Sequence, residues 1–225
     1  MAGLGPEADA FYHRQRLATT PQPPAMTVSD TARAHGAISH LPFDRSEIPD
    51  AVQPSARVLT FLALPDPGLR AELNQIAAEL ETITPTDDEG YAFFDAALMQ
   101  AATIERHEAL ARRFIARYQG SGHVTHGLQS PVCTARLLGD AAAILGENES
   151  ARRHYERARD DATRMRIRPE WALATLGLAE MLATGDEAQQ AEAQSHLDQA
   201  IAELQAMKMQ PALERALARK ELLTA

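Results

Sequence analysis

Apolar residues recur at intervals of three and four along most of the chain after residue 67, which is the spacing of one face of an α-helix. The first such stripe comprises Leu69, Leu73, Ile76, Leu80 and Ile83. Prolines, glycines and acidic residues interrupt the pattern and mark where one helix ends and the next begins. The expected helices span about 69–83, 88–103, 105–118, 131–145, 148–166, 170–184, 188–208 and 211–223.

Two copies of one pattern lie in the last hundred residues. The longer pattern is Ala151-x-x-His154-Tyr155-x-x-Ala158, and it recurs 42 residues later as Ala193-x-x-His196-Leu197-x-x-Ala200. The helix before each copy contains an Ala-x-x-Leu step, Ala142/Leu145 in the first and Ala179/Leu182 in the second, and these steps are 37 residues apart. A helix–turn–helix unit with about this period is typical of α-helical repeats, which bury their apolar faces by stacking. The pattern therefore predicts an all-α, right-handed solenoid of antiparallel helix pairs. The helix that begins at Pro211 would cap it.

The first part of the chain lacks this periodicity. Residues 1–56 contain one short amphipathic segment, Glu7–Leu17, and the proline-rich stretch Thr19–Pro24, which breaks helices. We expect a loosely ordered arm over 1–56 and a helical repeat domain over 57–225. The apolar run Val58–Leu64 is interpreted as a helix end or a strap over the first repeat, because strand-type residues are otherwise sparse.

Composition and charge exclude several classes of protein. Apolar residues make up 45% of the 225 positions and aromatic residues only 5%, which suits closely packed, alanine-rich helices. The net charge of −9 disfavours a nucleic-acid groove. The single cysteine, Cys133, rules out an internal disulfide and fits a reducing cytoplasm. No apolar run approaches the roughly 20 residues that cross a bilayer, and the N-terminus lacks the apolar core of a signal peptide.

The repeat region resembles the C-terminal tetratricopeptide-like part of large bacterial signalling ATPases, the kind fused to LuxR-type DNA-binding domains or to cyclase domains. The resemblance covers about residues 88–218. It is carried by Leu138-Gly139, Leu145-Gly146, Ala151 with His154-Tyr155-Glu156-x-Ala158, Arg168-Pro169, and Leu197 to Ala200 before Met207-Lys208-Met209.

The resemblance does not extend to the catalytic parts of those regulators. The chain contains no Gly-x4-Gly-Lys-Ser/Thr phosphate loop, and neither a helix-turn-helix nor a cyclase domain is recognisable. The resemblance therefore implies a non-enzymatic helical sensor or scaffold in signalling or transcriptional regulation. It implies no ATPase, cyclase or DNA-binding activity.

Five residues are predicted to contact a partner. In stacked helix pairs the first helix of each unit usually lines the concave side, and the offset of 37 relates Arg136 to Leu173. If the apolar residues of helix 131–145 face the core, Arg136 and Asp140 line this groove. Trp171 is of a type enriched at binding hot spots, although it could instead fill the gap between units. We expect a peptide, a helix of another domain or a second copy to bind at Arg136, Asp140, Trp171, Leu173 and Glu180.

An alternative reading rests on the loop at 123–133. His123, His126 and Cys133 have side chains that bind zinc, which suggests a small-molecule sensor or a metal-dependent protein. A structural zinc site needs four ligands, however, and the chain has no second cysteine. We therefore expect no metal and no cofactor. No Gly-x-Ser-x-Gly elbow occurs, so no catalytic residue is predicted.

Two further sets of residues receive structural interpretations. His154 and His196 occupy equivalent positions of the repeat. Because catalytic residues do not usually recur with a repeat, both are interpreted as structural residues. Seven arginines lie between Arg152 and Arg168, but Glu147, Glu149, Glu156, Asp160 and Asp161 alternate with them. A solvated helix face of mixed charge is therefore favoured over a nucleic-acid surface.

Overall fold

The computed structural model describes residues 68–81, 95–126 and 132–224. Eight α-helices contain 81% of these residues, so the predicted all-α class is confirmed. The helices are α4 (Leu69–Leu80), α5 (Asp95–Glu105), α6 (Glu108–Tyr118), α7 (Thr134–Ile144), α8 (Asn148–Met165), α9 (Arg168–Leu182), α10 (Glu187–Ala206) and α11 (Gln210–Thr224).

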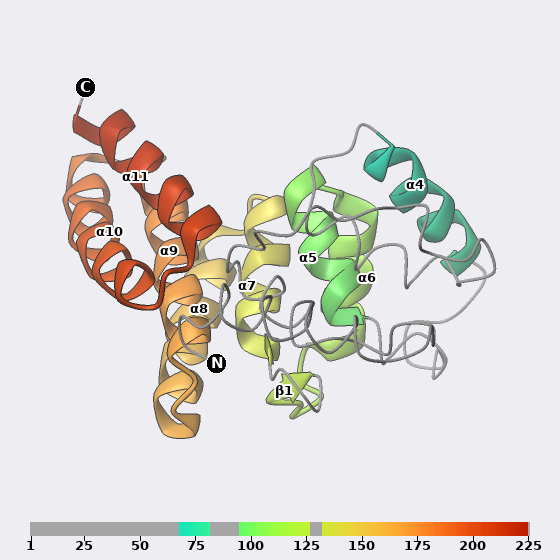
Figure 1. The fold of residues 1–225 in the computed structure, drawn as a ribbon. Coiled ribbons are helices and arrows are strands. Elements are labelled where there is room, and N and C mark those ends of the chain that lie inside the picture. Colours follow the sequence, from blue (N-terminus) through green and yellow to red (C-terminus); the bar gives the residue numbers. More distant parts are fainter. Residues whose placement is uncertain (1–67, 82–94, 127–131, 225) are drawn as a thin grey trace, which may run out of the picture.

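The helices progress across the molecule from α4 at one end to α10 and α11 at the other (Figure 1). From α5 onward, each helix packs against the next one in the sequence. In addition, α7 contacts both α5 and α9, and α9 contacts α11, so these four helices form one layer. Helices α6, α8 and α10 pack against this layer as the partners of consecutive pairs.

The same type of C-terminal turn ends four of the helices. After α5, α7, α8 and α10, one residue adopts a left-handed conformation, and the next backbone N–H donates to the carbonyl five residues earlier, as in a Schellman turn. The left-handed residues are Arg106 (φ 50°), Gly146 (φ 74°), Arg166 (φ 58°) and Lys208 (φ 55°). The bonds run from His107 to Ala102, Glu147 to Ala142, Ile167 to Ala162 and Met209 to Leu204, each at 2.9 Å.

The repeated pattern defines the interior. All of its small and apolar positions are buried: Ala151, Tyr155 and Ala158 in α8, and Ala193, Leu197 and Ala200 in α10. Equivalent positions thus perform the same packing role in both copies.

Measured at their C-terminal ends, the first helices of the two units are offset by 38 residues. Helix α7 ends at Ile144 and α9 ends at Leu182. The Leu-Gly pairs at 138–139 and 176–177 have the same separation. By these two markers Arg136 corresponds to Ala174, whereas the sequence offset of 37 relates it to Leu173.

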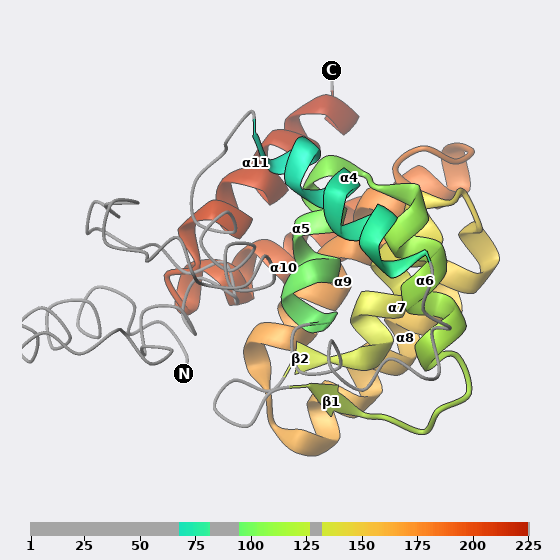
Figure 2. The ribbon, with the colours of Figure 1, turned by 90° about the vertical axis from the view of Figure 1, so that its right-hand side faces the viewer.

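A short hairpin replaces the expected start of α7. Strands β1 (Thr125–His126) and β2 (Val132–Cys133) pair antiparallel, with Thr125 opposite Cys133 (Figure 2). The prediction that the helix begins at 131 is wrong for Val132 and Cys133. The amide of Cys133 donates to the Glu170 side chain at 2.8 Å. The amide of Thr134 donates to the Val124 carbonyl at 3.0 Å, so the chain is held extended until α7 begins.

Several expectations fall on residues outside the described ranges. These are the arm over 1–56 and the apolar run Val58–Leu64. Within the described ranges, every helix is too short or too polar to span a bilayer.

Candidate functional site

A buried ion pair joins the first helices of the two units. Arg136 in α7 donates from Nε to Glu170 Oε2 at 2.8 Å and from Nη2 to Glu170 Oε1 at 3.2 Å. Glu170 belongs to the first turn of α9, and its side chain is 0% exposed. Its Oε2 atom also accepts the Cys133 amide. This carboxylate thus holds both α7 and the strand before it against α9.

Arg136 also pairs with a second carboxylate, that of Asp140, one turn further along α7. Arg136 Nη1 donates to Asp140 Oδ2 at 2.9 Å, and the Tyr155 hydroxyl of α8 donates to Asp140 Oδ1 at 2.8 Å. Burial raises the pKa of Asp140, and Arg136 and Tyr155 oppose that rise. Burial is also the largest cause that raises the pKa of Tyr155. The tyrosine therefore remains a neutral hydrogen-bond donor.

Two glycines make room for the Tyr155 ring. A Cβ atom on Gly139 would lie 2.7 Å from Tyr155 Cδ1, and one on Gly177 would lie 2.6 Å from Tyr155 Cε1. Gly139 belongs to α7 and Gly177 to α9, so the ring lies where two successive units meet. The absence of a side chain at both positions lets α8 approach the two helices closely.

A second ion pair links α9 to α11. Arg215 Nε lies 2.8 Å from Glu180 Oε1, with the side chains 52% and 25% exposed. Burial raises the pKa of Glu180, and Arg215 opposes this effect. This pair is nearer to solvent than the Arg136–Glu170 pair.

The five predicted partner-binding residues are distributed between the interior and the surface. Arg136 is 6% exposed and Leu173 is 9% exposed, so the accessibility expected of these two residues is wrong. Arg136 is buried because Glu170 and Asp140 neutralise it, and Leu173 packs in the apolar cluster of α9, α10 and α11. Asp140, Trp171 and Glu180 are partly buried. Partner binding by these residues stays a prediction.

The structure brings only some of these residues together. Arg136 and Asp140 are hydrogen-bonded to each other, and the charge of Asp140 contributes to raising the pKa of Glu180. Trp171 instead packs beneath the Arg159 guanidinium, which lies 5.2 Å from the ring centroid.

Sequence reasoning missed Glu170 and Tyr155 as members of the buried network, and it missed Arg215 as the partner of Glu180. Glu170 follows Pro169 in the first turn of a helix, where an acidic residue is usually explained by the helix dipole. Its partner, Arg136, lies 34 residues away in the sequence. For Tyr155, the one sequence signal of burial was that the second copy of the pattern has a leucine, Leu197, at the equivalent position.

The structure also shows where part of the alternative zinc set lies. Cys133 is buried, and burial, followed by Glu170, raises the pKa of its thiol to about 12, which opposes the thiolate that zinc needs. His123 is exposed, and its ring meets the edge of Tyr118. The side chain of His126 is outside the described part. Among the described residues, no three histidine, cysteine or acidic side chains are grouped to hold a metal ion.

Three histidines are held in environments that favour their neutral form. Burial is the largest cause that lowers the pKa of His107, His154 and His196. His107 precedes α6, where its Nδ1 accepts the Leu110 amide at 3.4 Å and its Nε2 lies 3.0 Å from Asn74 Oδ1. Such a residue must donate from Nε2 and accept at Nδ1, which a protonated imidazole cannot do.

We expect the free energy of unfolding to fall as the pH drops below about 6.5, the ordinary pKa of histidine. The unfolded chain takes up protons there, whereas the folded chain, with its lowered histidine pKa values, resists them. The variant His107→Asn keeps a capping side chain but does not titrate. Urea unfolding across this pH range should show a shallower decline for the variant. A decline as steep as that of the wild type would contradict this role for His107.

The comparisons with known proteins add no relative: no family model, no curated protein and no solved structure matches this chain.

Proposed function

We propose that the chain is a non-enzymatic interaction module of the tetratricopeptide-like kind, acting in cytoplasmic bacterial signalling or transcriptional regulation. Its helix pairs would stack as a right-handed solenoid, and α11 would cap the array. The partner would be a peptide or a domain of another protein that lies along the concave side. The resemblance of residues 88–218 to the repeat region of signalling ATPases supports this class of role.

The observation that carries the proposal is the shared packing of successive units at Tyr155. This residue of α8 fits against a glycine of its own unit, Gly139, and against a glycine of the next unit, Gly177. The second copy buries Leu197 at the equivalent position. Repeated units that meet through equivalent small residues are typical of helical arrays, which present an extended binding surface.

The contacts among helices support one side of the array as the proposed concave side. The layer of α5, α7, α9 and α11 is closely connected, whereas α8 lies less close to α6 and α10. An array curves toward the layer whose members approach one another most closely. In this arrangement Arg136 and Leu173 would support the surface from beneath, and Glu180 and Arg215 would be accessible to a partner, whereas Trp171 packs toward Arg159 of α8.

The test inverts one ion pair on this layer without removing it. The double variant Glu180→Arg/Arg215→Glu retains opposite charges between α9 and α11 but reverses their order. The control, Asp198→Lys/Lys220→Asp, inverts the exposed pair between α10 and α11, whose atoms are 2.6 Å apart. In an affinity capture with the full chain, we expect the first variant to lose the partner and the control to keep it. Equal capture by both variants would refute the groove assignment.

A further inference from the structure

The outer face of α8 carries a charge pattern that is complementary to itself. The face comprises Glu149, Arg153, Glu156, Arg157, Asp160 and Arg164, all exposed, while Ala151, Tyr155 and Ala158 on the opposite face are buried. Positions three and four apart follow one side of a helix, so the six charges form a single stripe. Five of them, all but Glu149, line a shallow, open depression on this side of α8.

Each charge has an opposite charge at the same distance from the middle of the stripe. About the midpoint between Glu156 and Arg157, Arg153 matches Asp160. Glu149 likewise matches Arg164, and Glu156 matches Arg157. When two copies of a helix pack antiparallel about a twofold axis, each residue meets the residue at the mirrored position of the other copy. All three kinds of contact would then join an acid to a base, and each would occur twice.

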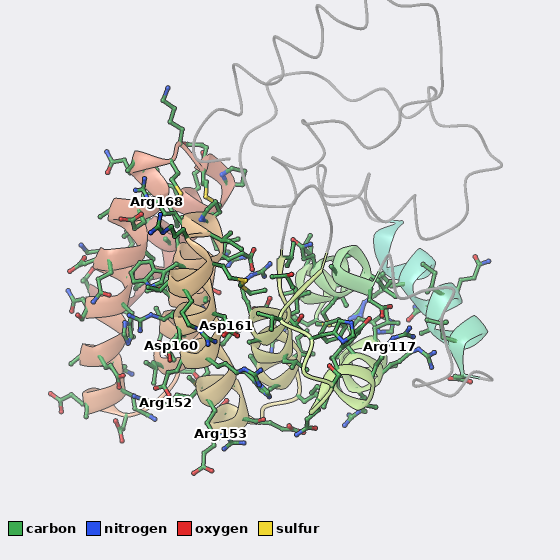
Figure 3. The ribbon with its side chains drawn as sticks, turned by 90° about the horizontal axis from the view of Figure 1, so that it is seen from below. Arg117, Arg152, Arg153, Asp160, Asp161 and Arg168 are labelled. Carbon is green, nitrogen blue, oxygen red and sulfur yellow. The ribbon has the colours of Figure 1, made fainter. Side chains whose placement is uncertain are left out.

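Two charges of the stripe, Arg153 and Asp160, have no side-chain partner among the described residues. The side chains of Arg153 and Asp160 form no hydrogen bond or ion pair in the described part of the protein, and Figure 3 labels both on α8. Three other charges of the stripe have partners within the chain: Glu156 pairs with Arg152, and Arg157 and Arg164 both contact Asp161. Arg153 and Asp160 are seven residues apart, so they lie on the same side of the helix, two turns from each other. They are therefore available for a second molecule.

We propose that the outer face of α8 is a self-association surface, on which a second copy of this chain packs antiparallel about a twofold axis between Glu156 and Arg157. The surface lies on the helix layer opposite the proposed concave groove, so the proposal does not depend on the proposed function. The interface is charged rather than apolar. Electrostatic complementarity contributes mainly to specificity and association rate, and salt screens it. The dimer is therefore weak and sensitive to ionic strength.

The test measures the dimerisation constant of the full chain by sedimentation at low and high salt. For the wild type we expect a reversible dimer at low salt that dissociates as salt is added. Arg153→Glu places like charges opposite each other at two symmetry-related sites, and it should weaken association about tenfold or more. Asp160→Arg should do the same. The double variant Arg153→Glu/Asp160→Arg restores both contacts with the charges exchanged, and its dimer should return to near the wild-type strength.

The control is Arg112→Glu, which changes the net charge equally on an exposed part of α6. It should leave the dimer unchanged apart from a small general effect of charge. A wild type that remains monomeric at low salt would overturn the proposal. So would a double variant as impaired as the single variants, or a loss of association in Arg112→Glu equal to that in Arg153→Glu.

Discussion

Replacing Arg136 with methionine should lower the free energy of unfolding at neutral pH by about 3–5 kcal/mol, as expected when one partner of a buried ion pair is removed. Methionine keeps much of the volume but leaves the Glu170 and Asp140 carboxylates without their cation. Both carboxylates are at most slightly exposed, at 0% and 11%, so water cannot replace the guanidinium. Urea unfolding followed by circular dichroism measures the loss.

Two comparisons separate this effect from a general loss of charge. Arg112→Met removes an arginine from an exposed pair with Glu108 on α6, and it should cost at most about 1 kcal/mol. The double variant Arg136→Met/Glu170→Gln removes the buried cation together with a buried anion, and it should be more stable than Arg136→Met alone. A single variant as stable as Arg112→Met would show that the pair contributes little.

The pH dependence of Arg136→Met provides a second readout. Without the arginine, the pKa of Asp140, already raised by burial, should rise further because a cause that lowers it is lost. A carboxyl group whose folded pKa exceeds its unfolded value stabilises the fold at low pH, and this stability is lost as the pH rises through the folded pKa. The difference in stability between wild type and variant should therefore shrink as the pH is lowered.

Replacing Gly177 with alanine should lower the free energy of unfolding by about 1–3 kcal/mol, the usual cost of overpacking a core. The new Cβ would lie 2.6 Å and 2.7 Å from two ring carbons of Tyr155, inside van der Waals contact. Tyr155 cannot withdraw freely, because its hydroxyl is bonded to Asp140 and its ring is confined by Gly139. Thermal and urea unfolding measure the effect.

The matched test removes the ring that causes the conflict. In the second copy the position of Tyr155 is occupied by Leu197, which is smaller and fully buried. Gly177→Ala should therefore cost clearly less in a Tyr155→Leu background than in the wild type. Additive losses in the double variant would show that the clash between residue 177 and the ring is not the cause.

The helices were predictable because their signals are local. The stripe from Leu69 to Leu80 follows the helical period, and Gly146 after α7 has the left-handed conformation expected of a C-terminal glycine. The breaks at Arg106, Arg166 and Lys208 have the same backbone geometry without a glycine. None of these three residues is a glycine or an asparagine, so the local sequence does not mark them as C-terminal left-handed positions.

The buried network was harder to predict than the helices. Arg136 and Asp140, four residues apart in one helix, were identified as polar residues beside an apolar face. Their burial depends on Glu170 and Tyr155, which come from other helices. A periodicity argument treats an arginine near the core as a surface residue. Only the position of α9 against α7 reveals that the charge is neutralised inside the fold.

The most direct test of the interaction-module account is an affinity capture with the full chain, with the metal content measured on the same preparation. The account predicts a specific protein that the wild type and Asp198→Lys/Lys220→Asp retain and that Glu180→Arg/Arg215→Glu loses, with metal well below one ion per chain. One zinc ion per chain, with no captured protein that responds to the variants, would contradict it. That result would direct attention to His123, His126 and Cys133.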